Sequence, residues 1–169
     1  MRPKRSRSSV RLVAFWAAIV AVVCVPREAA PGDAHAPLTR RIGLTVVQDT
    51  PMTFGTLADT DGYVEIGPDD DVLANPHHIQ VDDTVFSAVF DITGDPDRAF
   101  SMSIAGDNNQ GLTLNTFRTD QGEPPLGGLV LDGTGQFRVR IGARITVDAS
   151  QASPGADRSV PYTITVLYE

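Results

Sequence analysis

The amino-acid sequence predicts an all-β fold: a single β-sandwich of about seven to nine mostly antiparallel strands that follows an N-terminal signal peptide. Three observations carry this prediction. Apolar and polar residues alternate with the period of two that is typical of half-buried strands. Turn-forming residues interrupt these runs about every ten residues, as in sandwiches and barrels. After residue 36, no stretch shows the sustained periodicity of an amphipathic helix.

The runs with strand character are short, and most are bounded by Gly, Pro, Asp or Asn. The clearest hairpin signal is the turn sequence Asp-Gly-Thr-Gly at residues 132–135, which separates residues 129–131 from residues 137–143. The phenylalanines expected to point inward are Phe54, Phe86, Phe90, Phe100 and Phe137. Surface loops are expected at residues 67–78, 105–111 and 119–128. The expected strands cover residues 41–47, 52–57, 63–66, 85–93, 100–104, 112–117, 129–131, 137–143, 145–147 and 162–168.

The first 36 residues have the organisation of a signal peptide. Five basic residues precede residues 12–25, an uncharged apolar run of 14 residues that is short against the about 20 residues of a membrane span. Cleavage is expected after Ala36 or Ala34. A lipid anchor on Cys24 and an uncleaved anchor are the alternatives. The domains are therefore the signal peptide, residues 1–36, and the sandwich, residues 37–169, of a bacterial protein that is secreted, periplasmic or on the cell surface.

Removal of the signal peptide leaves a strongly acidic chain. The full chain has 14 basic and 21 acidic residues, and residues 1–36 contain six and two of them, which leaves 8 against 19, a net charge of −11, and no lysine. Such a surface repels phosphate backbones and anionic lipids, so we expect no nucleic-acid partner and no membrane contact beyond the signal peptide. The single cysteine, Cys24, lies in the signal peptide, so the sandwich has no disulfide or thiolate site.

Several short segments occur in an order and spacing that carry a resemblance. They are residues 44–46, 52–57, 88–94, 100–104, 141–147 and 162–168. Together they resemble a bacterial secreted family, domain of unknown function 4402. The resemblance implies a signal peptide followed by one immunoglobulin-like β-sandwich, a relation to fimbrial subunits, and no enzymatic role. Residues 156–161 depart from the family pattern, because such sequences usually run from a glycine directly into the final strand.

Aspartates in expected turns are the candidates for a metal site. Asp59 and Asp61, and the run Asp69, Asp70 and Asp71, present the carboxylate oxygens that Ca²⁺ prefers. The fragment at residues 59–62 lacks the other ligand positions of a calcium-binding loop, and aspartate is common in turns without any metal. Calcium is therefore the single cofactor candidate, and solvated loops are the competing interpretation.

The sequence offers little for catalysis. His77 and His78 are the histidines of the predicted mature chain, and neighbouring residues on a strand point to opposite faces. The nucleophile elbow, the H-E-x-x-H zinc motif and the phosphate-binding loop are all absent from the sequence. A carboxylate pair of the glycoside-hydrolase type stays open, because aspartate is abundant. We expect a protein that is not an enzyme.

The two ends of the sandwich carry features of assembly. Chaperone–usher pilins are similar in outline, since their last strand alternates apolar residues and ends in a penultimate aromatic, as Tyr168 does here after Gly155. The first strand, with Ile42, Leu44 and Val46 on one face, either pairs within its own domain or is donated to a neighbouring copy. These observations favour a fimbrial-type structural subunit or an adhesin-like module, whose partners are other copies of itself or related subunits. The alternative is a self-complete domain that binds calcium or a glycan.

Overall fold

The computed structural model describes residues 9–11, 43–80, 84–152 and 158–169, which form strands, turns and loops without a helix. None of the described residues thus belongs to a helix that could cross a membrane. The strands are β1 (Ser9–Arg11), β2 (Thr45–Thr50), β3 (Thr56–Ala58), β4 (Gly62–Ile66), β5 (Val72–Ala74), β6 (Ala88–Thr93), β7 (Ala99–Gly106), β8 (Asn108–Asn109), β9 (Leu112–Thr119), β10 (Leu126–Val130), β11 (Gln136–Val147) and β12 (Tyr162–Tyr168).

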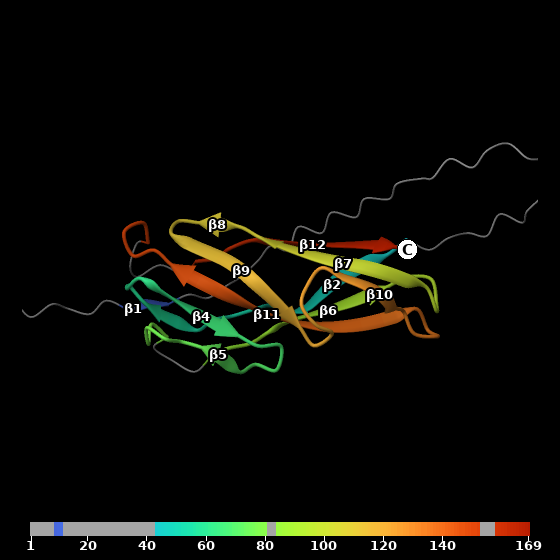
Figure 1. Cartoon of the computed structure of the whole chain (residues 1–169), viewed down its shortest axis with the longest axis horizontal. Coiled ribbons are helices and arrows are strands. Elements are labelled where there is room, and N and C mark those ends of the chain that lie inside the picture. The colour runs from blue at the N-terminus through green and yellow to red at the C-terminus, as the bar shows by residue number, and fades with distance from the viewer. Residues whose placement is uncertain (1–8, 12–42, 81–83, 153–157) are drawn as a thin grey trace, which may run out of the picture.

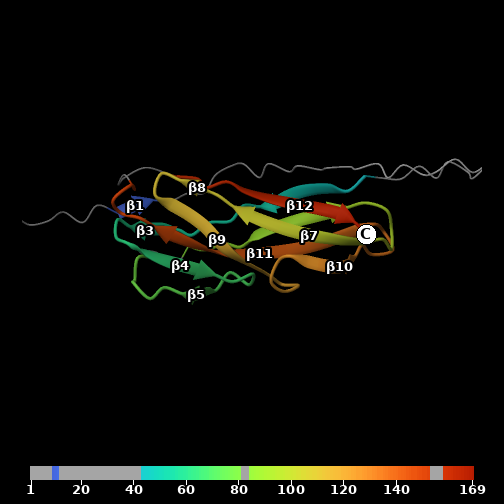
Figure 2. The same cartoon turned by 45° about the horizontal axis from the view of Figure 1, so that its top comes forward.

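Two sheets form the body of the molecule (Figures 1 and 2), and every strand pairing in them is antiparallel. The smaller sheet has the order β10-β7-β12 and the larger one β2-β6-β11-β4-β5. The long strand β11 pairs with β6 and then with β4 along one edge, and with β9 along the other. This confirms the predicted all-β sandwich. The short strands β1, β5 and β8 were not predicted, and they bring the number of strands above nine.

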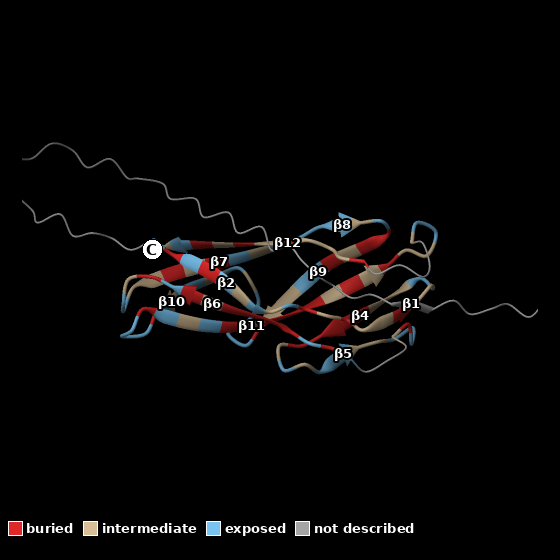
Figure 3. Ribbon diagram, turned by 180° about the vertical axis from the view of Figure 1, so that it is seen from behind, coloured by how far each residue is buried: buried red, intermediate tan, exposed pale blue. Residues whose placement is uncertain are grey.

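The core lies between the facing sides of the two sheets. Phe100 of β7 meets Phe137 of β11 edge to face at 5.2 Å, and Phe90 of β6 meets Tyr162 of β12 at 6.2 Å, so aromatic pairs join the sheets at two places. Figure 3 shows buried residues along β6 and β11 and exposed ones on β5 and β8. The inward placement of four phenylalanines is confirmed, but that of Phe86 is wrong: its side chain is 48% exposed.

The predicted hairpin of residues 129–131 and 137–143 is also wrong, although its turn forms. Asp132 Oδ1 accepts hydrogen bonds from Thr134 N at 2.8 Å and Gln136 N at 2.9 Å. The strands on either side of the turn then enter different sheets, since β10 pairs with β7 and β11 with β6. Leu131, at the start of the turn, is fully buried in the core. The chain therefore crosses from one sheet to the other here.

Two other predictions need correction. The strand expected at residues 52–57 is reduced to an isolated bridge, Thr53 to Phe86, followed by β3, and the loop expected at residues 67–78 contains β5. Strand β1, within the predicted signal peptide, pairs with β3, with Val10 opposite Leu57. The signal peptide itself stays a prediction, because residues 1–8 and 12–42 lie outside the described part of the chain.

Candidate functional site

The two terminal strands of the sandwich lie beside each other along one seam between the sheets (Figures 1 and 2). Gln48 of β2 donates a hydrogen bond to the hydroxyl of Tyr162 of β12, at 3.3 Å. At the other end of the seam, the side chains of Leu44 and Tyr168 both reach Gly94. Within the described residues, β2 pairs with β6 and β12 with β7, and each has a second edge without a strand partner. The seam is therefore bordered by two open strand edges.

The structure settles where the described assembly candidates lie. Leu44 and Val46 are buried in the chain's own core, and Val46 belongs to β2, which pairs with β6. In this structure the first strand of the sandwich is therefore paired within its own domain and is not donated to a neighbour. Tyr168 is half-buried, and its hydroxyl accepts a hydrogen bond from the backbone N–H of Asp95 at 2.6 Å. It thus fastens the end of β12 to the opposite sheet. Ile42 and Gly155 lie outside the described residues.

The run Asp69, Asp70 and Asp71 divides into different environments. Asp70 Oδ1 accepts hydrogen bonds from the N–H of Ser87 at 2.6 Å and from its hydroxyl at 2.7 Å, and Oδ2 binds Arg140 at 2.6 Å. Burial raises the pKa of Asp70, but these hydrogen bonds and the arginine charge outweigh it and hold the pKa below its usual value. Asp69 and Asp71 are exposed. Asp70 thus links its loop to Ser87 and to Arg140 of β11.

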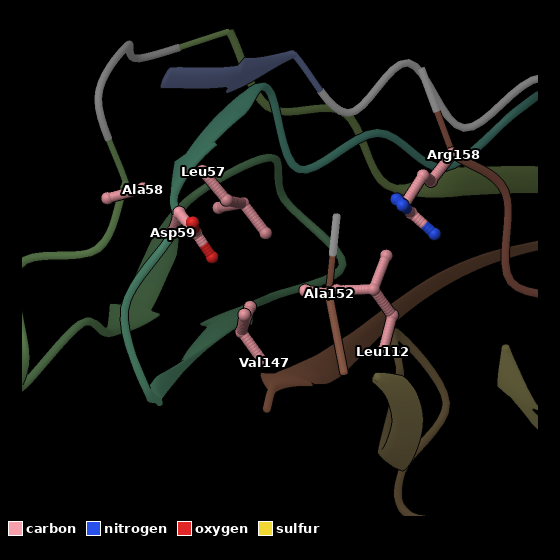
Figure 4. Close-up of a pocket in the computed structure, with 7 residues that line it drawn as sticks. All are labelled: Leu57, Ala58, Asp59, Leu112, Val147, Ala152 and Arg158. Atoms are coloured by element: carbon pink, nitrogen blue, oxygen red, sulfur yellow. The ribbon is translucent and has the colours of Figure 1, made fainter. Parts of the chain in front are cut away.

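Asp59 and Asp61 point to different surroundings. Asp61 Oδ1 accepts a hydrogen bond from the backbone N–H of Ala149 at 2.7 Å. Asp59 borders a small space of about 10 Å³, and Figure 4 shows it across this space from Arg158. Its buried Oδ1 has no hydrogen-bond partner among the described residues. The space has the size that one water molecule needs. In the described part of the chain, no group of three or more His, Cys, Asp or Glu side chains is placed to hold a metal ion.

The outer side of the larger sheet carries a set of ion pairs that the sequence did not predict. Arg138 on β11 binds Asp49 of β2 at 2.5 Å and Asp91 of β6 at 3.2 Å, and Arg140 on β11 binds Asp70. Arg138 and Arg140 alternate with the buried residues Val139 and Ile141, which puts them on the solvent side of β11, whereas their acidic partners come from distant segments. The term charged face is used below for Arg118, Arg138, Arg140 and Arg144 with the carboxylates that they bind.

The most buried group of the charged face is Glu65 of β4, whose side chain is 5% exposed. Its Oε1 binds Arg118 Nε at 2.7 Å, and its Oε2 binds Arg144 Nη2 at 2.6 Å. Arg144 also lies over the ring of Tyr63, 4.4 Å from the centroid, and Arg118 continues to the exposed Glu123. Burial raises the pKa of Glu65, but the two guanidinium groups more than compensate, and the pKa is lowered. Glu65 is therefore a charged carboxylate with both oxygens occupied, which leaves it without the free oxygen of a general base.

On the smaller sheet, the outward residues of β7 and β12 are different, because they carry no charge. In register, Leu167 lies opposite Ser101, Thr165 opposite Ser103 and Thr163 opposite Ala105. These side chains point away from the core, where their neighbours Ile164, Val166 and Met102 are buried. The term uncharged face is used below for Ser101, Ser103, Ala105, Thr163, Thr165 and Leu167.

The fold and these surfaces define an all-β sandwich domain whose terminal strands β2 and β12 are edge strands, with one neutral face. The model of the family described as Domain of unknown function (DUF4402) matches residues 44–168, which is most of the chain. The protein therefore belongs to this family, as the sequence resemblance indicated. No curated protein and no solved structure matches the chain significantly.

Proposed function

We propose that this protein is a non-enzymatic secreted or cell-surface subunit, of fimbrial type, that associates with other subunits by strand addition along β12. The observation that carries the proposal is the open edge of this seven-residue strand, whose opposite edge pairs with β7 over its whole length. An extended strand from a neighbouring subunit can form main-chain hydrogen bonds with such an edge.

The charge distribution supports this edge as the place of contact. The predicted mature chain has a net charge of −11, so two copies repel each other over most of their surfaces. The uncharged face begins at β12 and includes the outward residues Thr163, Thr165 and Leu167. Leu167 is 43% exposed and adds apolar surface to this face. A neighbour that adds to β12 therefore meets no charged side chain within the strand itself, and Glu169 follows at its end.

The buried seam limits the form of this association. In a sandwich that lacks a strand, core residues along the gap stay exposed until a donor strand covers them. Here Leu44, Val46, Ile164 and Val166, which border the seam, are all at most 9% exposed. The sandwich is thus closed without a donor, and the added strand extends the sheet at its edge instead of completing the core.

The test is the size of the secreted full-length product, measured by light scattering after size-exclusion chromatography over a range of concentrations. We expect oligomers that grow with concentration. Leu167→Lys places a charge at the open edge and should give a monomer, as lysines do on natural edge strands. Val130→Lys is the matched control, because Val130 is 52% exposed on β10, at the other edge of the same sheet. A wild-type protein that stays monomeric at its solubility limit contradicts the proposal.

The calcium alternative has less support. Asp70 is engaged with Ser87 and Arg140, and Asp61 with the backbone of Ala149. Addition of calcium should therefore leave the melting temperature unchanged. A rise of the melting temperature with calcium, absent with magnesium, would favour the self-complete calcium-binding domain.

A further inference from the structure

A depression lies between β7 and β9, at the end of the sandwich where the chain passes through β8. The two strands approach most closely at Gly106, where an added Cβ would collide with the carbonyl oxygen of Leu114. They diverge from this point, because β7 belongs to the smaller sheet and β9 to the larger one. The resulting depression is shallow and open to solvent, with a volume of about 530 Å³.

The floor of the depression is shaped by a bulge in β9. The register between β9 and β11 shifts between Asn115 and Arg118, so that Thr116 and Phe117 are accommodated opposite Ala143 alone. Thr116 has a φ of 51°, a left-handed conformation that strains a β-branched residue. Bulges of this kind re-aim side chains and are frequent next to functional sites. Here the bulge brings Phe117 into the lining of the depression.

The lining combines the apolar side chains of Ile104, Leu114 and Phe117 with amide and hydroxyl side chains. Phe117 is half-buried, and its ring packs against Tyr162 at 5.9 Å, which fixes its position. Asn108 Nδ2 donates to Thr113 Oγ1 at 2.9 Å, and the hydroxyl of Thr116 donates to Asn115 Oδ1 at 3.0 Å. These hydrogen bonds hold the rim side chains in place before any ligand arrives, which lowers the entropy lost on binding.

From this arrangement we infer that the depression between β7 and β9 is a binding site for a neutral oligosaccharide. A pyranose ring has a C–H face that packs on an aromatic ring such as Phe117, and hydroxyl groups that pair with amides such as Asn108 and Asn115. Asp107 is the one acidic residue of the described lining, and no basic residue lines it. Sugars with a carboxylate or sulfate group therefore lack a counter-charge at this site, and neutral hexoses or N-acetylhexosamines fit it best.

The inference does not rest on strand addition at β12, because its contacts lie on β8, β9 and the end of β7. It is tested by nuclear magnetic resonance of the ¹⁵N-labelled secreted full-length product, titrated with chitotriose, maltotriose and, as an acidic probe, sialyllactose. We expect a neutral trisaccharide to shift the amide signals of residues 104–117 and the acidic probe to leave them unshifted. Millimolar affinity is sufficient for detection by this measurement.

Three variants separate the site from the fold. Asn115→Ala removes an exposed amide and should weaken sugar binding about fivefold, the effect of one neutral hydrogen bond, without lowering the melting temperature. Thr116→Gly removes the rim hydroxyl and the strained φ, so it should weaken binding while raising the melting temperature. Thr165→Ala, on the uncharged face, is the control and should bind like the wild type.

The opposite results overturn the inference. If none of the neutral sugars shifts the signals of residues 104–117, or if Asn115→Ala binds as tightly as the wild type, the depression is not a sugar site. A peptide with the sequence of residues 45–50 serves as the competing probe, because diverging strands also offer main-chain groups to an extended chain. Shifts with this peptide and none with the sugars would make the depression a strand-addition site.

Discussion

The outer sides of the two sheets are both strand surfaces in contact with water, but their side chains differ in length and charge. The charged face consists of long side chains over the larger sheet that are joined by ion pairs. Glu65 alone binds two arginines. The uncharged face carries hydroxyl groups, an alanine and a leucine, and it has no ion pair among its described residues. The larger sheet thus uses its surface for its own cohesion. On the smaller sheet, the described side chains of this face make one long hydrogen bond, from Ser101 Oγ to the carbonyl oxygen of Leu167 at 3.4 Å.

The largest effect is expected where the charged face is most buried. Glu65→Gln removes the charge between Arg118 and Arg144 and should lower the free energy of unfolding by about 1–2 kcal/mol, between the scales of an exposed and a buried pair, because both arginines are partly exposed. Glu123→Gln is the control. Glu123 is 71% exposed and binds the same Arg118, so its loss should change stability by less than about 0.5 kcal/mol. Urea denaturation measures both, and equal effects would show that burial does not distinguish these pairs.

Part of the pH dependence of stability should come from the charged face, beside the turn aspartates Asp132 and Asp148, whose pKa values are also lowered. The pKa values of Glu65 and Asp70 are lowered in the folded state, from ordinary values of 4.5 and 3.8. Their contribution is therefore fully present above the ordinary values and is lost as the pH falls through the lowered ones. The urea midpoint should be level at neutral pH and fall below pH 4.5, and less steeply in Glu65→Gln. A variant of the uncharged face, Thr165→Ala, should keep the wild-type profile.

A smaller effect of opposite sign is expected at the strained residue of β9. Thr116→Gly relieves a left-handed φ that costs a β-branched residue about 1–2 kcal/mol, and the extra backbone entropy of glycine offsets about half of this. The net result should be a stabilisation of up to about 1 kcal/mol in thermal or urea unfolding. The matched change Thr165→Gly, at an outward strand position whose φ is not positive, should destabilise. A loss of stability in Thr116→Gly would mean that the bulge depends on the threonine itself.

The smallest effects on stability are expected at exposed residues of the two faces, Arg138 on the charged face and Thr165 on the uncharged face. Arg138 is 59% exposed, and its partners Asp49 and Asp91 are 46% and 43% exposed, so Arg138→Ala should cost less than about 1 kcal/mol in spite of two ion pairs. Thr165→Ala should cost even less, about 0.5 kcal/mol at most. A large loss in Arg138→Ala, measured by urea unfolding, would mean that the number of pairs matters more than their burial.

Side-chain alternation predicted which residues share a face, but it could not say in which sheet a strand lies. The alternation of β12 placed Ile164 and Val166 inward, and both are buried as expected. The same signal joined residues 129–131 to residues 137–143 as a hairpin. The turn chemistry at Asp132 was interpreted correctly, yet the strands part, because burial of Leu131 between the sheets is a tertiary effect that no local pattern contains.

The candidate sites were less predictable than the fold for the same reason. Asp70 was found as a turn residue, but its partners Ser87 and Arg140 are 17 and 70 positions away. Tyr168 was found as a penultimate aromatic, but its contact with Asp95 spans 73 positions. The depression depends on a register shift opposite β11, and the sequence near Thr116 contains no glycine or proline that would signal one. Such long-range contacts need the folded structure.

The antiparallel pairing of β7 with β12 also sets how far the depression lies from the two ends of the described domain. Leu44 and Tyr168 meet beside Gly94, so the described domain begins and ends at the same pole. Gly106 pairs with Tyr162 and Phe100 with Tyr168, which places the depression six residue steps, or about 20 Å, from this pole. A chain tethered through either terminus would therefore hold the depression about 20 Å away from the tether.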